Sequence, residues 1–569
     1  VCHMLTVVIS LIVLSGPIGD TAKLPVDLIP EVTVPNIDYI TVEEENILHD
    51  VKGGKYRFAV PNEVSVTPKS HGVWEKLPNN KMRWSVRVTC DNSVSMNVGF
   101  GRYEMPSSGS MVISDENREF EIRPFTVEDN KDHGELWTPI IPSNELLIEV
   151  VIDRHEKNQL SNQIELTAIN PGYRGFKSAN VMGSSGACNI DVLCDEGDDW
   201  WDVIPSVGVY TLSGWWTCTG AMVNNTAQDY TPYFLTADHC GVTSSSDSSI
   251  VVYWNHQNSF CREPGSSASG NNGNGSYSQF TSGSTMRATR SYTDFTLTEL
   301  SSQPNTSWGV TYAGWSRQTS GGNGAGIHHP QTAEKRISFP DYMSPSGEFY
   351  NVNWAQGRTA PGSSGSPLFD GNHRIVGQLC CGSASCSSDS NDYYGRSFGL
   401  SWSYLDDWLD PTGSNVQFLD TLGDEPVAIG ACCIGTTGSC INIAEANCSA
   451  GGGTWMGDGS SCDAGDCEPV ILGACCIAST GSCINIEEST CNAGGGTWMG
   501  EDSSCDAGDC DQNDCPTDTN GDSVTNVTDL LYVVAEWGAG SSSGADVNGD
   551  GTVNVGDILE VVAEWGSCE

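Results

Sequence analysis

The carboxy-terminal part of the chain contains two copies of a segment with six cysteines, and this repeat strongly constrains the fold. The copies begin at Gly430 and, 43 residues further on, at Gly473, each with the string GACC. Neither copy contains a histidine. Six cysteines without histidine indicate small modules held by disulfides rather than zinc sites. We expect these modules at residues 430–468 and 473–511, with the cysteine pairing left open by the sequence.

A second repeat follows, with an offset of 28 residues, and it has the spacing of calcium-binding loops. Alternate oxygen-bearing side chains followed by a late carboxylate suit a hard cation with many ligands. Each loop precedes an apolar-periodic helix, and Cys515 and Cys568 bracket the pair as a predicted disulfide. Paired loop–helix units of this kind resemble dockerin modules, which implies Ca²⁺ and a cohesin-like or cell-surface partner. The predicted ligands are Asp518, Asn520, Asp522, the carbonyl of Val524 and Asp529, then Asp546, Asn548, Asp550, the carbonyl of Thr552 and Asp557.

Length and charge place this chain among multidomain, exported proteins. With 569 residues it is too long for one core, and its formal net charge of −46 disfavours nucleic acid and anionic membranes as partners. Residues 4–14 form an apolar run that is too short to span a membrane, and we interpret residues 1–20 as a signal peptide, with a buried strand as the alternative. The 24 cysteines agree with an oxidising, extracellular destination.

The region before the cysteine-rich modules is mainly β in its pattern. Residues 21–180 alternate apolar and polar positions in short runs, which predicts a β-sandwich; we interpret it as a pro-region, with a substrate-binding sandwich as the alternative. Residues 183–420 are rich in Gly and Ser and contain many short β-like runs, which favours an all-β double barrel over an α/β sheet.

Three short segments, residues 236–240, 293–295 and 362–367, contain the residue types of a hydrolytic triad. His239 is the candidate base, Asp294 the orienting carboxylate and Ser364 the nucleophile, because a serine hydroxyl needs an oriented imidazole to remove its proton. An α/β-hydrolase has its catalytic histidine downstream of a Gly-x-Ser-x-Gly string, whereas Ser366 stands here in the last position of that string. The order histidine, aspartate, serine is that of the chymotrypsin class.

The stretch from about 183 to 420 resembles bacterial lysyl endopeptidases, a branch of the chymotrypsin-like serine proteases. The resemblance implies two β-barrels with the triad between them, and an oxyanion hole formed by the amides of Gly362 and Ser364. It also implies disulfides between Cys188 and Cys386, Cys194 and Cys261, and Cys218 and Cys240. The shared strings are ACNIDV at 187–192, VNNTA at 223–227, VVYWN at 251–255, IHHP at 327–330, AEKRIS at 333–338 and DWLD at 407–410.

Substrate specificity needs a separate carboxylate. In trypsin-like enzymes, the carboxylate that binds the basic side chain of the substrate lies six residues before the nucleophile. Here Arg358 occupies that position and would repel a cation. In lysyl endopeptidases the charge lies in an Asp-x-Tyr-Gly-Arg string, so Asp392 is our candidate, with an exposed loop aspartate as the alternative. Two departures concern this pocket: Cys380, followed by Cys381, replaces a histidine of the family, and Ala360 replaces a glutamate.

Lysine placement supports the same specificity. Nine of the ten lysines lie at or before Lys177, whereas the arginines divide evenly, eight before Lys177 and eight after it. A protease that cuts after lysine would process its pro-region and spare its mature body. The sequence therefore predicts a secreted serine endopeptidase that cleaves protein or peptide substrates after lysine and needs no cofactor for catalysis. The alternatives are arginine or mixed basic specificity on the same scaffold, and a non-catalytic surface-binding protein.

Overall fold

The computed structural model divides the chain into two compact units, one up to Val427 and the other from Ala428 onward. The predicted signal peptide and Lys177 lie outside the described residues. No helix among the residues that are described is long and apolar enough to cross a membrane. The structure describes residues 24–50, 55–176, 186–271, 273–318, 322–423, 429–434, 439–444, 448, 453–457, 460–462, 472–477, 482–500, 503–505, 515–522, 524–541 and 543–567.

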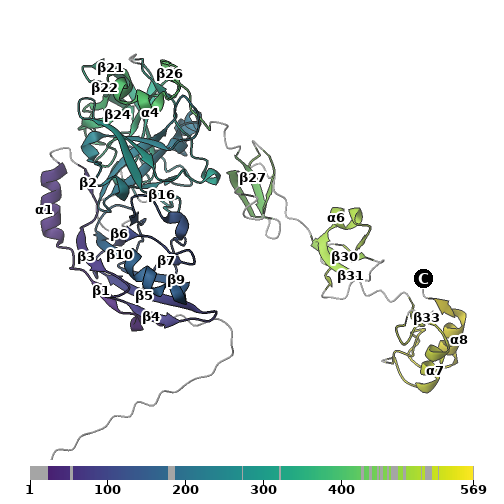
Figure 1. The fold of residues 1–569 in the computed structure, drawn as a ribbon. Helices are drawn as coiled ribbons and strands as arrows, with labels where there is room; N and C mark the ends of the chain where they lie inside the picture. The colour runs from purple at the N-terminus through teal and green to yellow at the C-terminus, as the bar shows by residue number, and fades with distance from the viewer. Residues whose placement is uncertain are drawn as a thin grey trace, which may run out of the picture. The chain divides into compact units, whose positions relative to one another are not determined.

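The first unit begins with two sheets packed face to face, drawn in purple and blue in Figure 1. Alternating side chains such as Trp84, Val86 and Ile148 point inward and form a shared core. Two helices accompany the sheets, α1 (Tyr39–Asp50) and α2 (Lys157–Gln163). The first sheet has the order β1 (Glu31–Thr33), β5 (Lys81–Thr89), β9 (Glu145–Asp153), β7 (Ser110–Asp115), with β4 (Val73–Lys76) beside β5; the second has the order β3 (Asn62–Val66), β10 (Ile164–Gly172), β6 (Ser95–Tyr103), β8 (Leu136–Trp137).

Two further sheets follow within the first unit, drawn in teal and green (Figure 1). In the second of them β23 pairs with both β20 and β24, so six strands close into a barrel. The first sheet contains β16 (Phe280–Ser282), β15 (Val251–Tyr253), β12 (Val207–Leu212), β13 (Trp216–Val223), β14 (Tyr233–Thr236), β18 (Phe295–Leu300) and β17 (Ser284–Arg290). The second contains β23 (Pro367–Asp370), β20 (Gly324–His328), β21 (Arg336–Ser346), β22 (Phe349–Gln356), β25 (Asp392–Gly395), β24 (Ile375–Gly382), β19 (Trp315–Ser316) and β26 (Phe418–Leu419), with β11 (Ile190–Asp191) beside β21.

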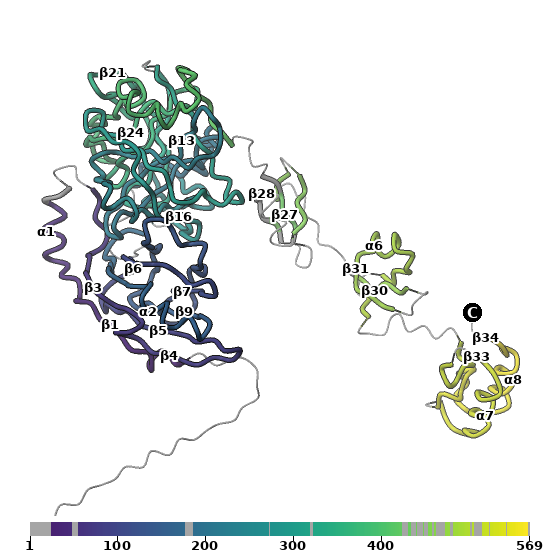
Figure 2. The backbone as a smooth tube through the Cα atoms, viewed as in Figure 1, coloured from purple at the N-terminus to yellow at the C-terminus, as the bar shows by residue number. Residues whose placement is uncertain are grey.

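One strand from the amino-terminal region joins the sheet of β13. β2 (Tyr56–Arg57) pairs antiparallel with β13, with Arg57 opposite Trp216. The N–H of Phe58 extends this pairing by donating to the carbonyl of Trp215 at 3.0 Å. Figure 2 shows the backbone of this unit, with β3 of the sandwich in purple and β13 in teal. The sandwich is therefore tied to the barrel region by backbone hydrogen bonds as well as by side-chain packing.

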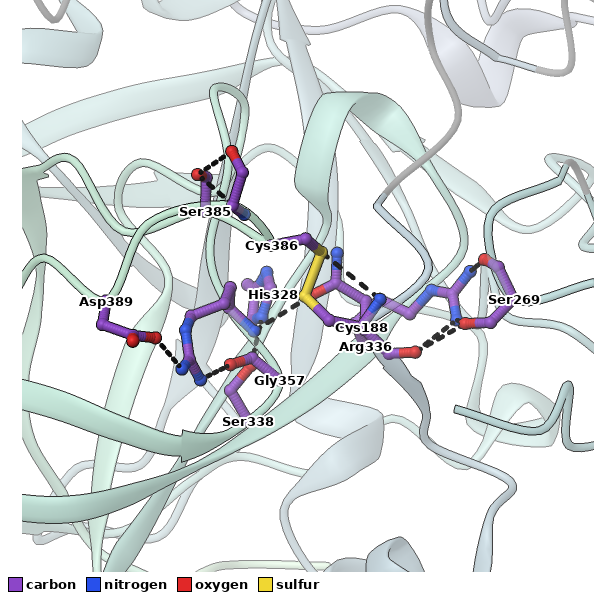
Figure 3. Close-up of a disulfide and its surroundings, with 12 residues drawn as sticks. Cys188, Ser269, His328, Arg336, Ser338, Gly357, Ser385, Cys386 and Asp389 are labelled. Atoms are coloured by element: carbon purple, nitrogen blue, oxygen red, sulfur yellow. Dashed lines mark hydrogen bonds and ion pairs between the residues drawn. A yellow bond between two sulfur atoms is a disulfide. The ribbon is translucent and has the colours of Figure 1, made fainter. Parts of the chain in front are cut away.

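Three disulfides staple the barrel region, and they join the pairs that the resemblance implies: Cys188 with Cys386, Cys194 with Cys261, and Cys218 with Cys240. Figure 3 shows the first of them. It closes the longest loop of the three, with a sequence separation of 198 residues, and a longer closed loop removes more entropy from the unfolded chain.

The second unit contains two small sheets of the same design. In each, a strand with the CC string is central: β27 (Ile429–Ile434) lies between β28 (Ser439–Ala444) and β29 (Thr454–Trp455), and β30 (Leu472–Ile477) between β31 (Ser482–Glu487) and β32 (Thr497–Trp498). Helix α6 (Glu488–Ala493) follows β31. The described pairings repeat with the sequence: Cys432–Cys448 and Cys440–Cys462, then Cys475–Cys491 and Cys483–Cys505.

The last segment contains two helices, α7 (Val527–Ala535) and α8 (Val555–Ala563), and a short pairing of β33 (Val524–Thr525) with β34 (Gly566–Ser567). Val533 and Val561 are buried between the helices, whereas Val534 and Trp537 are about half exposed. The predicted apolar face is therefore buried only in part. Cys515 is disulfide-bonded, and Cys568, the partner predicted for it, lies outside the described residues.

Candidate active site

His239 and Asp294 form a hydrogen-bonded pair. His239 lies in a short 3₁₀ turn (Asp238–Cys240) directly after β14, and Asp294 ends the turn that leads into β18. Nδ1 of His239 is 2.8 Å from Oδ2 of Asp294, and the backbone N–H of His239 donates to Oδ1 at 2.9 Å. Both carboxylate oxygens are thus engaged by one residue. This fixes the orientation of the imidazole and leaves its other nitrogen, Nε2, free of the aspartate.

The backbone of Asp294 is held in an uncommon conformation. Its φ angle is 53°, in the left-handed region that aspartate tolerates better than most residues. Its carbonyl accepts hydrogen bonds from the N–H of Asp238 at 3.1 Å and from Nε2 of Gln378 at 3.1 Å. The same Gln378 amide donates to the carbonyl of Thr293 at 2.7 Å. β24, which contributes Gln378, therefore helps to position the carboxylate from the other barrel.

Ser364 lies in the loop between β22 and β23, against the segment that precedes His239. The carbonyl of Ser364 accepts a hydrogen bond from the N–H of Thr219 at 2.9 Å. A Cβ added to Gly365 would meet the Ala237 nitrogen at 2.8 Å, so only glycine permits this approach. The structure places the serine loop beside the histidine segment. The structure contains no hydrogen bond between Nε2 of His239 and the hydroxyl of Ser364. Nε2 is buried and has no partner among the described residues.

Ser363, the residue before the proposed nucleophile, is hydrogen-bonded to a buried histidine. Nδ1 of His328 is 2.9 Å from Oγ of Ser363, and its Nε2 is 3.0 Å from Oγ of Ser338 (Figure 3). Burial lowers the pKa of His328 to about 3, so the ring is neutral. His328 therefore supports the serine loop, with both of its ring nitrogens engaged by serine hydroxyls.

The two predicted oxyanion-hole donors are the amides of Gly362 and Ser364. Gly362 has a φ of +93°, and its carbonyl accepts from Oγ1 of Thr219 at 2.9 Å, which turns that peptide away from the loop interior. Within the described part of the chain, neither of the two amide N–H groups donates a hydrogen bond. An oxyanion hole needs donors that are not already engaged, and these two amides meet that requirement.

Asp392, the candidate specificity residue, is a buried carboxylate at the start of β25. Only 1% of its surface is exposed. Its Oδ2 accepts from Nε1 of Trp354 at 2.7 Å and from Oγ1 of Thr359 at 2.6 Å, and its Oδ1 accepts from the N–H of Ala384 at 3.3 Å. Burial raises the pKa of Asp392 above that of an ordinary aspartate. The alternative of an exposed loop aspartate does not fit this burial.

Arg358 forms no ion pair with that carboxylate, although its charge partly offsets the effect of burial on the pKa of Asp392. Its guanidinium donates to Oδ1 of Asp389 at 2.9 Å, a residue labelled at the margin of Figure 3, and to the carbonyl of Gly357. None of the described cations forms an ion pair with Asp392. A buried carboxylate without a cationic partner is costly unless a ligand supplies the charge.

A cavity of about 380 Å³ lies beside the Cys188–Cys386 disulfide. Arg358 and Glu196 are among the residues that line it. None of the triad candidates lines this cavity, so it is separate from the candidate triad.

The predicted calcium ligands lie in two loops that precede α7 and α8. In the first loop, carboxylate oxygens of Asp518, Asp522 and Asp529 lie within 4.8 Å of one another. The N–H of Asn520 donates to Asp529, and the carbonyl of Val524 accepts from the amide of Asn526 at 2.9 Å. Three carboxylates at this spacing fit a hard divalent cation.

The second loop repeats this arrangement in part. Asp557 is fully buried and caps α8 through the N–H of Asn554, as Asp529 caps α7. Oδ1 of Asp546 is buried and has no partner among the described residues, which is the situation expected of a cation ligand. The N–H of Asn548 donates to Asp557 at 3.2 Å and the N–H of Thr552 to Asp550 at 3.0 Å.

Sequence reasoning missed several residues that build the site. Gln378, Thr219 and Trp354 position Asp294, the serine loop and Asp392 respectively. None stands in a motif of the triad, and each acts across a distance of at least 38 residues along the chain. Only the order of the barrel strands brings them together.

Comparison with known proteins supports a peptidase. Residues 182–395 match the family described as lysyl endopeptidase, C-terminal domain. A lysyl endopeptidase from Pseudomonas aeruginosa is 27% identical over 295 residues, which cover 46% of this chain and 61% of that protein. The chain therefore matches about three fifths of the length of this relative.

Solved structures are similar to part of the chain. Human heparin binding protein is 15% identical with a TM-score of 0.27, over 38% of this chain and 94% of that one. The Rv3671c protease from M. tuberculosis, in its active form, is 12% identical with a TM-score of 0.25, over 41% of this chain and 91% of that one.

Proposed function

We propose that this protein is a secreted serine endopeptidase that cleaves peptide bonds on the carboxyl side of lysine. The observation that carries the proposal is the His239–Asp294 pair, with its Nδ1–Oδ2 distance of 2.8 Å, next to the loop of Ser364. The similarity of residues 182–395 to lysyl endopeptidases supports it.

In the proposed reaction Nε2 of His239 removes the proton of the Ser364 hydroxyl while Oγ attacks the scissile carbonyl. Asp294 holds the imidazole by Nδ1 and stabilises the imidazolium that forms. The amides of Gly362 and Ser364 bind the oxyanion, and the imidazolium then protonates the leaving amine. A water molecule, activated by the same histidine, releases the acyl group from Ser364.

Covalent labelling tests the nucleophile directly. A fluorophosphonate probe should label the purified protein once per chain, and peptide mapping should place the label on Ser364. Ser364→Ala should abolish labelling, whereas Ser366→Ala, a change in the same loop, should retain it. Labelling that persists in Ser364→Ala, or the absence of labelling in the wild type, would refute the proposal.

Two observations support lysine specificity: the buried carboxylate of Asp392 and the burial of Lys335, the one lysine after Lys177. The buried, unpaired carboxylate of Asp392 offers a charge for a substrate ammonium group. Lys335 is fully buried, and its Nζ donates to the carbonyl of Ile204 at 2.8 Å. The barrels therefore expose no lysine among their described residues to a second copy of the enzyme.

We also propose that residues 21–180 are a pro-region that keeps the enzyme latent. β2 of this region is hydrogen-bonded to β13, next to the Cys218–Cys240 disulfide that follows His239. Nζ of Lys55 lies 5.5 Å from the centre of the Trp216 ring, and burial lowers the pKa of Lys55. A strand added to this edge occupies backbone groups that an extended substrate would use.

The latency proposal has a test that leaves the triad intact. In a chain kept unprocessed by Lys177→Gln, Phe58→Pro removes the N–H that donates to Trp215 and should speed fluorophosphonate labelling. Phe58→Ala, which loses the same ring but keeps the N–H, is the matched control and should label at the slow rate. Equal labelling rates in the Pro variant and its control would contradict latency through β2.

For the carboxy-terminal segment we propose a structural Ca²⁺ module that docks onto a partner. The carboxylates of Asp518, Asp522 and Asp529 in the first loop, and Asp546 and Asp557 in the second, would hold the ions. Exposed apolar side chains repeat on both helices and offer a docking surface: Leu531, Val534 and Trp537, then Leu559, Val562 and Trp565.

Chelation tests the calcium proposal. Chymotrypsin should cut the full chain after Tyr532 and Trp537 faster in EGTA than in Ca²⁺, because the metal stabilises the loops that begin α7 and α8. Asp529→Asn should be cut rapidly in both buffers. Cleavage that is equally slow with and without the chelator would show that the module does not depend on calcium.

A further inference from the structure

β24 contacts three parts of the candidate active site: Asp294, the serine loop and Asp392. Gln378 binds the backbone of Asp294, and Leu379 exchanges hydrogen bonds with the serine loop, donating to Ser366 and accepting from Gly365. At the end of the strand Gly382 lies opposite Asp392. Between Leu379 and Gly382 stand two consecutive cysteines, for which the proposed reaction has no use.

The pairing of β24 with β25 is interrupted at these cysteines. Leu379 is opposite Tyr394 and Cys381 is opposite Tyr393, so Cys380 is an extra residue in β24. Consecutive side chains of a regular strand point to opposite faces, and a bulge removes that alternation. The register shift therefore lets the side chains of Cys380 and Cys381 approach each other.

The two sulfur atoms are 2.7 Å apart. Both residues are unbonded cysteines, and the one other cysteine of this kind in the described part of the chain is Cys90, in the sandwich. Cys381 is exposed and Cys380 is half-buried. Cys90 is buried, so Cys380 and Cys381 are the adjacent thiols open to solvent among the described residues, and such a pair is suited to thiol–disulfide exchange.

The pair also lies against the charged groups of the triad. The pKa of the Cys380 thiol is raised by its hydrogen bond to Cys381, by burial and by the charge of Asp294. The bond from Cys380 lowers the pKa of Cys381, while burial opposes this, and the charge of His239 lowers it further. Cys381 is therefore the thiol that reacts first, and Cys380 is the one that faces Asp294.

We propose that Cys380 and Cys381 are a redox modification site, at which a low-molecular-weight disulfide oxidises the two thiols to a disulfide between consecutive residues. This thiol chemistry does not rest on the proposed peptidase function.

The exchange proceeds in two steps. The Cys381 thiolate attacks one sulfur of the small disulfide, which forms a mixed disulfide and expels one small thiolate. The Cys380 thiolate then attacks the sulfur of Cys381, which forms the Cys380–Cys381 bond and expels the second small thiolate. The protein loses two protons and two electrons, and the small disulfide gains them as two thiols.

The test treats the full chain with glutathione disulfide and then with reduced glutathione, which is milder than the reagents that open buried disulfides. Alkylation followed by mass spectrometry should show Cys380 and Cys381 protected after oxidation, with a peptide lighter by two hydrogens, and both reactive again after reduction. Thiols that remain reactive throughout, or a mixed disulfide that persists on Cys381, would overturn the modification site.

The double variant Cys380→Ser/Cys381→Ser is the matched control and should show no loss of two hydrogens after the same treatment. A loss of two hydrogens in this variant would place the oxidation at another pair of thiols and overturn the assignment.

Discussion

The amino-terminal sandwich and the two barrels are both built mainly from antiparallel strands around buried apolar cores, yet they differ in the exposure of their lysine side chains. The described lysines of the sandwich, such as Lys69 and Lys76, are exposed or half-buried. The barrels contain Lys335, which is fully buried. One region offers the bond that the proposed enzyme cuts, and the other conceals it. The difference is the one expected if the proposed enzyme removes its own sandwich and spares its barrels.

Removing the nucleophile should break this comparison most severely. Ser364→Ala should lower kcat by at least about 10⁴-fold, because members of a triad act as a unit. The variant chain should also persist at full length, with the sandwich still attached, whereas the wild type is processed. Steady-state hydrolysis and the mass of the purified chain measure the two effects, and a processed Ser364→Ala chain would show that another enzyme makes the cut.

The comparison also shows what the sequence could and could not predict. The order of His239, Asp294 and Ser364 and the choice of Asp392 follow from local strings, because each residue stands in a motif. The contacts of Gln378 with Asp294 depend on how two barrels meet, and no local pattern encodes that meeting. The approach of Cys380 to Cys381 depends on a one-residue bulge, which a strand pattern does not reveal.

The second-largest effect should come from the pocket carboxylate. Asp392→Asn removes one member of the charge pair proposed to form with a lysine substrate, which costs about 2 to 5 kcal/mol, or roughly 30- to 5,000-fold in kcat/KM. Asp389→Asn is the matched control, since Asp389 is exposed and contacts Arg358. Unchanged lysine preference in Asp392→Asn, measured with paired lysine and norleucine peptides, would move the pocket elsewhere.

The pH dependence of lysine cleavage sharpens the same point at smaller amplitude. Burial raises the pKa of Asp392, so the carboxylate that must be ionised to bind an ammonium group becomes protonated at a higher pH than usual. We expect kcat/KM for a lysine peptide to fall on acidification before kcat/KM for an uncharged peptide does. Parallel profiles for the two peptides would contradict a role for this carboxylate in binding.

Lys335 should affect stability rather than activity. Burial lowers its pKa from 10.5 to about 7, so between these values the unfolded chain binds a proton that the folded chain does not. Stability contributed by this group therefore increases from pH 7 toward pH 10.5 and is lost as the pH falls through that window. Lys335→Met should flatten this increase, as urea unfolding at several pH values would show, and an unaltered slope would argue against a neutral buried amine.

The central claim is that the barrels cut after lysine with Ser364 as nucleophile. Digestion of a diverse peptide library by the processed enzyme, with the Ser364→Ala chain as the blank, tests both parts at once. We predict that nearly every new amino terminus follows a lysine and that the blank produces none. Cleavage after arginine at a similar frequency, or cleavage without regard to charge, would contradict the account.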